Sequence, residues 1–157
     1  MLLTLMRHGI AESWAASDSE RRLTPGGERI VMDVIAGLKA GGWLPGGVVC
    51  SPLTRSRQTA DLVLDAFPGT ALEVTKSVLE PEDGLLDELA WREMVDPVVV
   101  GHEPGLSRFA AQLLGSRGIL SFQPAAVACF RVDGLPPRNP AEMLFFAPPI
   151  FARCFRL

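Results

Sequence analysis

The sequence has few residues that could cross-link the chain or hold a metal ion. Of its 157 residues, three are cysteine and two are histidine. Cys50, Cys129 and Cys154 are too widely spaced to predict a disulfide framework or a zinc cluster. Small buried hydrophobic side chains are the simpler interpretation of them. With two histidines and no cysteine pair, we expect no structural metal site.

Long apolar runs and an excess of basic charge are also absent. No apolar run approaches the roughly 20 residues that span a bilayer. The segment from Met1 to Met6 is too short for a signal peptide, and Arg7 interrupts it. A net charge of -3 argues against a general nucleic-acid binder, whose footprint is basic. We expect a cytoplasmic protein that binds neither membrane nor nucleic acid, and that would hold an anion through local arginines.

Two familiar phosphate motifs are missing as well. There is no Gly-x4-Gly-Lys-Ser/Thr loop, which argues against a P-loop enzyme. Cysteine phosphatases need Cys-x5-Arg, so that one loop wraps the phosphate, but the position reached from Cys50 is Ser56. Both classes are therefore set aside.

Apolar patterning predicts an α/β fold. The composition, 48% hydrophobic and 21% charged, is that of a globular chain, and its length fits one domain, residues 1–157. Alternating strands and helices predict a three-layer αβα sandwich with a mostly parallel central sheet. The last two strands are expected to pair as an edge hairpin, and the tail from Pro148 to pack on the body. The expected strands are 2–6, 48–50, 72–78, 97–100, 125–132 and 143–146, and the expected helices are 25–40, 53–66, 84–95 and 104–114.

Three segments place basic residues directly after short apolar runs. They are Arg7-His8-Gly9, Ser51-Pro-Leu-Thr-Arg55-Ser-Arg-Gln-Thr-Ala60 and Gly101-His102-Glu103-Pro104. Parallel strands deliver their carboxyl ends to one edge of a sheet, so the basic residues of all three should share a pocket. Arginine presents a rigid fork of donors that matches phosphate oxygens. Helices beginning near Pro52 and Pro104 would aim backbone N–H groups at the same place. Two histidines among arginines suit phosphoryl transfer, since one can attack phosphorus while the other donates to an oxygen.

In their order and spacing, these three motifs resemble the histidine phosphatase superfamily, which has the phosphoglycerate mutase-like fold. Within it, the compact length and the stretch Ala16-Ser-Asp-Ser-Glu-Arg-Arg-Leu-Thr24 are most similar to short bacterial phosphohistidine phosphatases of the SixA type. The resemblance implies that His8 is the nucleophile and carries a transient phosphoryl group. It also implies that no metal or cofactor is needed, because arginines supply the positive charge.

The resemblance implies roles for other residues too. Arg7, Arg55 and His102 would clamp the phosphoryl oxygens, and Gly9, Ser51, Gly101 and Arg21 would complete the substrate site, with Arg22 as the rival of Arg21. Larger relatives use a glutamate after the third strand as general acid. Glu80 stands at that place, and Glu82 and Asp83 are its competitors. Glu103 departs from the asparagine common in the third motif, and either an outward orientation or a role at the leaving-group side is open.

The predicted function is hydrolysis of phosphohistidine on a protein, such as a phosphotransfer domain. Only about 20 residues separate Thr59 from Glu80, which leaves little room for a lid, so a folded partner could reach the pocket. A mutase would need a lid to exclude water. Two alternatives remain: a phosphatase or mutase for small phosphate esters, and a phosphate-binding module without turnover. The protein is expected to be a monomer or a weak dimer.

Overall fold

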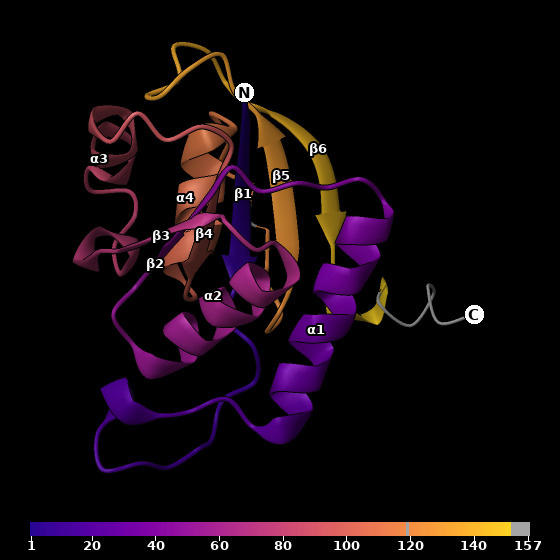
Figure 1. Ribbon diagram of the computed structural model, residues 1–157. Coiled ribbons are helices and arrows are strands. Elements are labelled where there is room, and N and C mark those ends of the chain that lie inside the picture. The colour runs from indigo at the N-terminus through magenta and orange to yellow at the C-terminus, as the bar shows by residue number, and fades with distance from the viewer. Residues whose placement is uncertain (119, 152–157) are drawn as a thin grey trace.

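One mixed sheet forms the centre of the molecule. The structure is a computed structural model and describes residues 1–118 and 120–151. Strands β3, β2, β4 and β1 run parallel, and β5 and β6 extend the sheet antiparallel in the order β3-β2-β4-β1-β5-β6 (Figure 1). The expected edge hairpin is therefore confirmed. The strands are β1 (Leu2–Arg7), β2 (Gly47–Cys50), β3 (Ala71–Val74), β4 (Pro97–Gly101), β5 (Val127–Arg131) and β6 (Glu142–Ala147).

Helices cover both faces of the sheet and make the predicted three layers. They are α1 (Pro25–Ala40), α2 (Thr54–Ala66), α3 (Leu85–Trp91) and α4 (Gly105–Leu113). Strand β4 shows how the layers arise, because successive side chains of a strand point to opposite faces. Val98 and Val100 pack in the core beneath α1 and α2, whereas Val99 packs in the core beneath α3 and α4. A continuous apolar strand thus serves two cores at once.

Helix α1 begins as its sequence predicts. Thr24 has an extended backbone, and its hydroxyl oxygen accepts a hydrogen bond from the Gly27 amide at 2.9 Å. Pro25 takes the first helical position, where a missing N–H costs nothing. Gly41 ends the helix. This fixed start matters for the site, because the preceding segment leads from the first motif into α1.

Two expected elements are shorter in the structure. The strand expected over 72–78 ends at Val74, because Thr75 caps the short 3-10 helix η2 (Lys76–Val78) with its side chain. The helix expected over 84–95 covers only Leu85–Trp91. Positive φ at Glu93 (52°) and Asp96 (45°) makes the chain turn toward β4 instead of continuing the helix. The spacing of the apolar residues predicts Trp91 on the apolar side of this helix together with Leu85 and Leu89, but Trp91 is 81% exposed.

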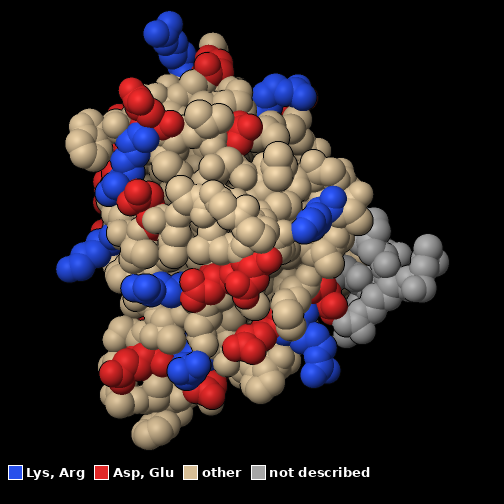
Figure 2. Space-filling view, viewed as in Figure 1, with Lys and Arg blue, Asp and Glu red and all other residues tan. Residues whose placement is uncertain are grey.

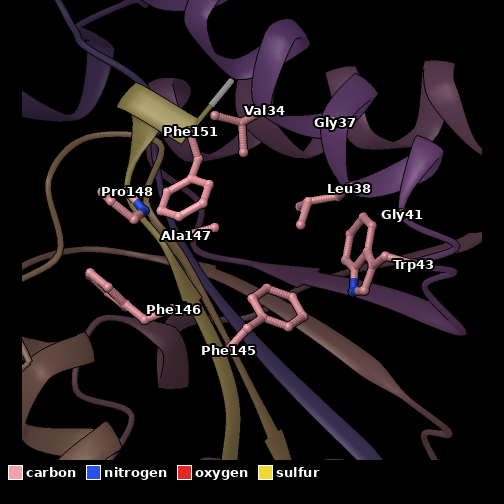
Figure 3. Close-up of a pocket in the computed structure, with 10 residues that line it drawn as sticks. All are labelled: Val34, Gly37, Leu38, Gly41, Trp43, Phe145, Phe146, Ala147, Pro148 and Phe151. Atoms are coloured by element: carbon pink, nitrogen blue, oxygen red, sulfur yellow. The ribbon is translucent and has the colours of Figure 1, made fainter. Parts of the chain in front are cut away.

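The start of the C-terminal tail borders an apolar cavity of about 290 Å³ between α1 and β6 (Figure 3). Phe145, Leu38 and Trp43 line it, together with Pro148 and Phe151 of the tail. Residues 148–151 therefore pack on the body in part. The rest of the tail, including Cys154, lies outside the described residues. None of the predicted site residues lines this cavity. In the described ranges, no helix is long and apolar enough to cross a membrane.

Candidate active site

The three motifs meet at one edge of the sheet, as expected. Strand β4 lies between β1 and β2, with Arg7 opposite Gly101 and Cys50 opposite Val100. The next residue along each strand therefore emerges at the same edge. These residues are His8, Ser51 and His102.

The His8 ring is held in a defined orientation. Its Nδ1 lies 2.7 Å from the Gly9 carbonyl oxygen, which can only accept, so Nδ1 carries the proton. In the neutral ring, the lone pair is then on Nε2. The centroids of the His8 and His102 rings are 5.0 Å apart, with the rings tilted by 51°. His8 is 8% exposed, so it presents this lone pair from a largely desolvated position.

Both histidines are strongly held in the neutral form. Burial, followed by the neighbouring charges of Arg55, Arg7 and Arg21, lowers the pKa of His8 to about 4, against the opposing effect of the Gly9 hydrogen bond. Burial, His8 and the same charges of Arg55 and Arg7 lower the pKa of His102 to about 3. A histidine that stays neutral at physiological pH keeps its lone pair available for attack.

Two buried nitrogens at this edge have no hydrogen-bond partner. Ser51 Oγ and His102 Nε2 are hydrogen-bonded at 2.5 Å, but His102 Nδ1 is unpaired. Arg7 donates from Nη1 to the Phe122 carbonyl at 2.7 Å, whereas its Nε is unpaired. Buried polar atoms are normally satisfied, so two unpaired nitrogens in the same site are candidate contacts for a ligand that accepts hydrogen bonds.

The remaining arginines are joined by a carboxylate. Buried Arg55, near the start of α2, donates from Nη1 to the Asp18 carbonyl at 2.7 Å and from Nη2 to Asp18 Oδ2 at 3.0 Å. Arg21 donates from Nη1 to Asp18 Oδ1 at 3.0 Å. The charge of Arg21 also contributes to the low pKa of His8, whereas Arg22 is exposed and makes no such contribution. The placement thus favours Arg21 over Arg22.

The glycines of the motifs allow close packing around the histidines. A Cβ on Gly9 would lie 2.7 Å from Val31 Cγ2 of α1, closer than real contacts permit. The Gly9 amide also donates to Thr59 Oγ1 at 3.1 Å, and the Thr59 hydroxyl donates to the Arg55 carbonyl at 2.8 Å. A Cβ on Gly101 would meet Leu106 at 3.0 Å. Gly9 and Gly101 therefore bring backbone close to the site, and Thr59 fixes the turn that orients His8.

Within the part of the chain that the structure describes, none of the acidic candidates shares a hydrogen bond with this network. Glu80 is exposed, and its charge acts on Arg108 of α4. Glu82 pairs with the same arginine, and Asp83 is exposed. In the described residues, no side-chain hydrogen bond joins Glu80 to the histidines or arginines of the site. The segment that carries it nevertheless packs on the start of α4, because Pro81 lies against Gly105.

Glu103 turns inward rather than outward. Its Oε1 accepts from the Phe122 amide at 2.9 Å, and both carboxylate oxygens lie 2.7 Å from Ser107 Oγ. Arg7 donates to the carbonyl of the same residue, so both the amide and the carbonyl of Phe122 are hydrogen-bonded to side chains of the site. Glu103 also acts electrostatically on Arg7. Its carboxylate therefore fixes the loop that holds Arg7.

Sequence reasoning did not find every residue of this arrangement. The links from Thr59 to Gly9 and from Ser51 to His102 join segments far apart in the chain, and their motifs gave no hint of which side chains meet. Asp18 belongs to the stretch that resembles the SixA type, but no motif assigns it a role. Its spacing of three residues before Arg21 is the one local signal that an ion pair could form.

Comparisons with known proteins identify the class. A histidine among arginines at the carboxyl ends of parallel strands, on this fold, is the arrangement of a phosphatase with the phosphoglycerate mutase-like fold. The family model described as "Histidine phosphatase superfamily (branch 1)" matches residues 3–99. The chain belongs to this superfamily and is a phosphatase.

The chain is also similar to individual proteins and solved structures. An uncharacterized protein of Picosynechococcus sp. is 37% identical over 118 residues, covering 70% of this chain and 71% of that protein. A phosphohistidine phosphatase SixA homolog of Haemophilus influenzae is 28% identical, over 92% of this chain and 93% of its own. The solved structure of the protein histidine phosphatase SixA complexed with tungstate superposes with a TM-score of 0.84 at 26% identity, covering 96% of this chain and 99% of that one.

Proposed function

We propose that this chain removes phosphoryl groups from phosphohistidine on proteins, through a covalent phosphohistidine at His8. The observation that carries the proposal is the state of His8. Its ring is neutral, its Nδ1 proton is fixed on the Gly9 carbonyl, and its Nε2 lone pair stands among the charges of Arg7, Arg55 and Arg21.

In the first step, His8 Nε2 attacks phosphorus. The other ring nitrogen of the substrate phosphohistidine takes a proton from solvent beforehand. The Nε2–P bond then forms while the bond from phosphorus to the leaving nitrogen breaks, and the departing ring takes that electron pair and leaves as neutral imidazole. Charge in such a transition state is spread over the three equatorial oxygens. In this proposal the unpaired Arg7 Nε and His102 Nδ1 donate to these oxygens, and Arg55 adds a nearly buried positive charge.

In the second step, water hydrolyses the phosphoenzyme. A water oxygen bonds to phosphorus, the Nε2–P bond breaks, and inorganic phosphate leaves with the neutral His8 restored. The same donors serve both steps because both pass through the same phosphoryl geometry. A P–N bond to imidazole is already labile, so the exposed position of Glu80 is compatible with a weak need for a general acid.

Two features favour a protein substrate. Between the end of α2 at Ala66 and Glu80, the chain forms only β3 and η2, which leaves no inserted helix to close over the site. The relatives named as SixA match nearly the whole chain at 26–28% identity.

Acidic and basic side chains are interspersed on the face that carries α1 and α2 (Figure 2). That face therefore presents no field of one sign.

A substrate comparison tests the proposal. Wild type and His8→Ala are given a phosphohistidine-bearing phosphotransfer domain and a panel of small phosphate esters. Rapid loss of protein phosphohistidine that depends on His8, with slow ester turnover, is expected. Efficient turnover of one ester without effect on the protein would instead make the chain a small-molecule phosphatase. Absence of turnover on every substrate, with phosphate still bound, would make it a binding module.

A further inference from the structure

Two arginines of the proposed phosphate site already hold an anion that belongs to the chain. The Asp18 carboxylate bridges Arg55 and Arg21, with one oxygen on each guanidinium. Each guanidinium thus gives one charge-assisted hydrogen bond to the carboxylate, the kind of bond that arginine also gives to phosphate oxygens. Neither the motifs nor the proposed reaction gives Asp18 a role.

The carboxylate enters the site from its outer side. The Asp18 side chain is 65% exposed, whereas that of Arg55 is 9% exposed. The charge of Asp18 also acts on His102, so the carboxylate lies within electrostatic range of the residues that surround His8. A phosphoryl group on His8 that reached Arg55 and Arg21 would compete with this carboxylate for the same donors.

We propose that the Asp18 carboxylate is an internal competitor of phosphate, which occupies Arg55 and Arg21 in the empty enzyme and must be displaced when a phosphoryl group binds. Free anions such as the product phosphate therefore bind more weakly than the arginines alone would allow. A phosphoprotein gains further contacts with the enzyme and displaces the carboxylate more readily. The site then favours phosphoproteins over free phosphate and releases its product easily.

The segment that carries Asp18 is closed at its base by bonds that do not involve the site. Residues Ala11 and Leu23 form an antiparallel bridge, and the Glu12 amide donates to the Arg22 carbonyl at 2.8 Å. These bonds close the base of the segment independently of the site. In the described structure, every hydrogen bond between residues 13–20 and helix α2 ends on Asp18. Displacing the carboxylate therefore removes the side-chain bonds of the tip without opening its base, and the bond from Arg55 Nη1 to the Asp18 carbonyl is then the remaining hydrogen bond from the tip to α2 in the described structure.

A competing interpretation gives Asp18 the opposite effect. The carboxylate could hold the two arginines in position, with their remaining N–H groups turned to phosphate. Removing it would then weaken anion binding. The two interpretations differ in the sign of one measurable quantity, the affinity of the empty enzyme for a tetrahedral oxyanion.

The test measures binding of inorganic phosphate and of tungstate by calorimetry to wild type, Asp18→Asn and Asp18→Ser. Removal of one partly exposed charge from the site is expected to tighten binding of both anions about threefold to tenfold. Asp87→Asn is the matched control, since it removes an exposed carboxylate from α3 and should leave the affinity unchanged. Thermal unfolding confirms that each variant is folded. Unchanged or weaker anion binding in both Asp18 variants would overturn the proposal.

The inference rests on the proposed phosphate site, but not on the identity of the substrate. Anion binding needs no turnover, so the two failures are distinguishable. Tighter binding by Asp18→Asn in a protein that leaves phosphohistidine intact would refute the proposed function alone. Normal turnover of phosphohistidine with unchanged anion affinity in the Asp18 variants would refute the internal competitor alone.

Discussion

The low pKa of His8 predicts a specific loss of stability in acid. Burial and the charges around it hold the pKa of His8 at about 4 in the folded protein, below the ordinary value of 6.5. The unfolded chain therefore binds a proton on His8 at a pH where the folded protein does not. The resulting stability is fully present above about pH 6.5 and is lost as the pH falls toward about 4.

The magnitude follows from the two pKa values. At about pH 5, nearly all unfolded chains carry the proton, whereas about one folded molecule in ten does. The difference lowers the free energy of unfolding by about 2 kcal/mol relative to about pH 7.5, where His8 contributes almost nothing. Replacement by glutamine removes the titrating group, so His8→Gln should not show this part of the loss.

Urea unfolding of wild type and His8→Gln at the two pH values measures the effect. Carboxylates and His102 titrate in both proteins, so the difference between the two losses isolates His8. Wild type should lose about 2 kcal/mol more than His8→Gln between about pH 7.5 and about pH 5. Equal losses in the two proteins would refute the reasoning, because His8 would then titrate alike in the folded and unfolded states.

Three further predictions concern residues around His8. Arg55→Ala should weaken tungstate binding and lower kcat together by about tenfold or more, while Arg57→Ala, an exposed arginine on the same helix, should change neither in the same calorimetric and kinetic assays. Thr59→Val leaves the buried Gly9 amide without its acceptor, so urea unfolding should show a loss of about 1–2 kcal/mol, with a lower kcat because His8 is less well oriented. Glu103→Ala should cost about 1–3 kcal/mol in the same unfolding assay, and Glu103→Gln, which keeps an acceptor for the Phe122 amide, clearly less.

The sequence predicts the elements that position the site better than those around it. Strands β1, β2 and β4 are short apolar runs followed by motif residues, and a strand buried on both faces leaves little choice of structure. Helix α1 carries its start signal in Thr24 and Pro25. The helix predicted over 84–95 is longer than α3 in the structure. Its end depends on positive φ at Glu93 and Asp96, which the types of these residues do not indicate.

Within the site, the sequence predicts which residues gather but not how they are joined. Because each motif follows a strand of a predicted parallel sheet, the sequence predicts that Arg7, His8 and His102 lie at one sheet edge. The bond between Ser51 and His102 depends on the register of β2 against β4, and the bridge from Arg55 to Asp18 on how the segment before α1 folds back. Such contacts are long-range in sequence, so local patterns carry no signal for them. The acid role of Glu80 stays a prediction.

The central claim is that His8 carries the phosphoryl group during turnover. Its most direct test is a single-turnover reaction with a phosphohistidine-bearing phosphotransfer domain, quenched in alkali, where phosphohistidine survives, and mapped by mass spectrometry. The account predicts a phosphoryl group on His8 that forms before phosphate is released, and none in His8→Ala, which should also be inactive yet folded. Release of phosphate without any phosphorylated His8, or near-normal turnover by His8→Ala, would contradict it.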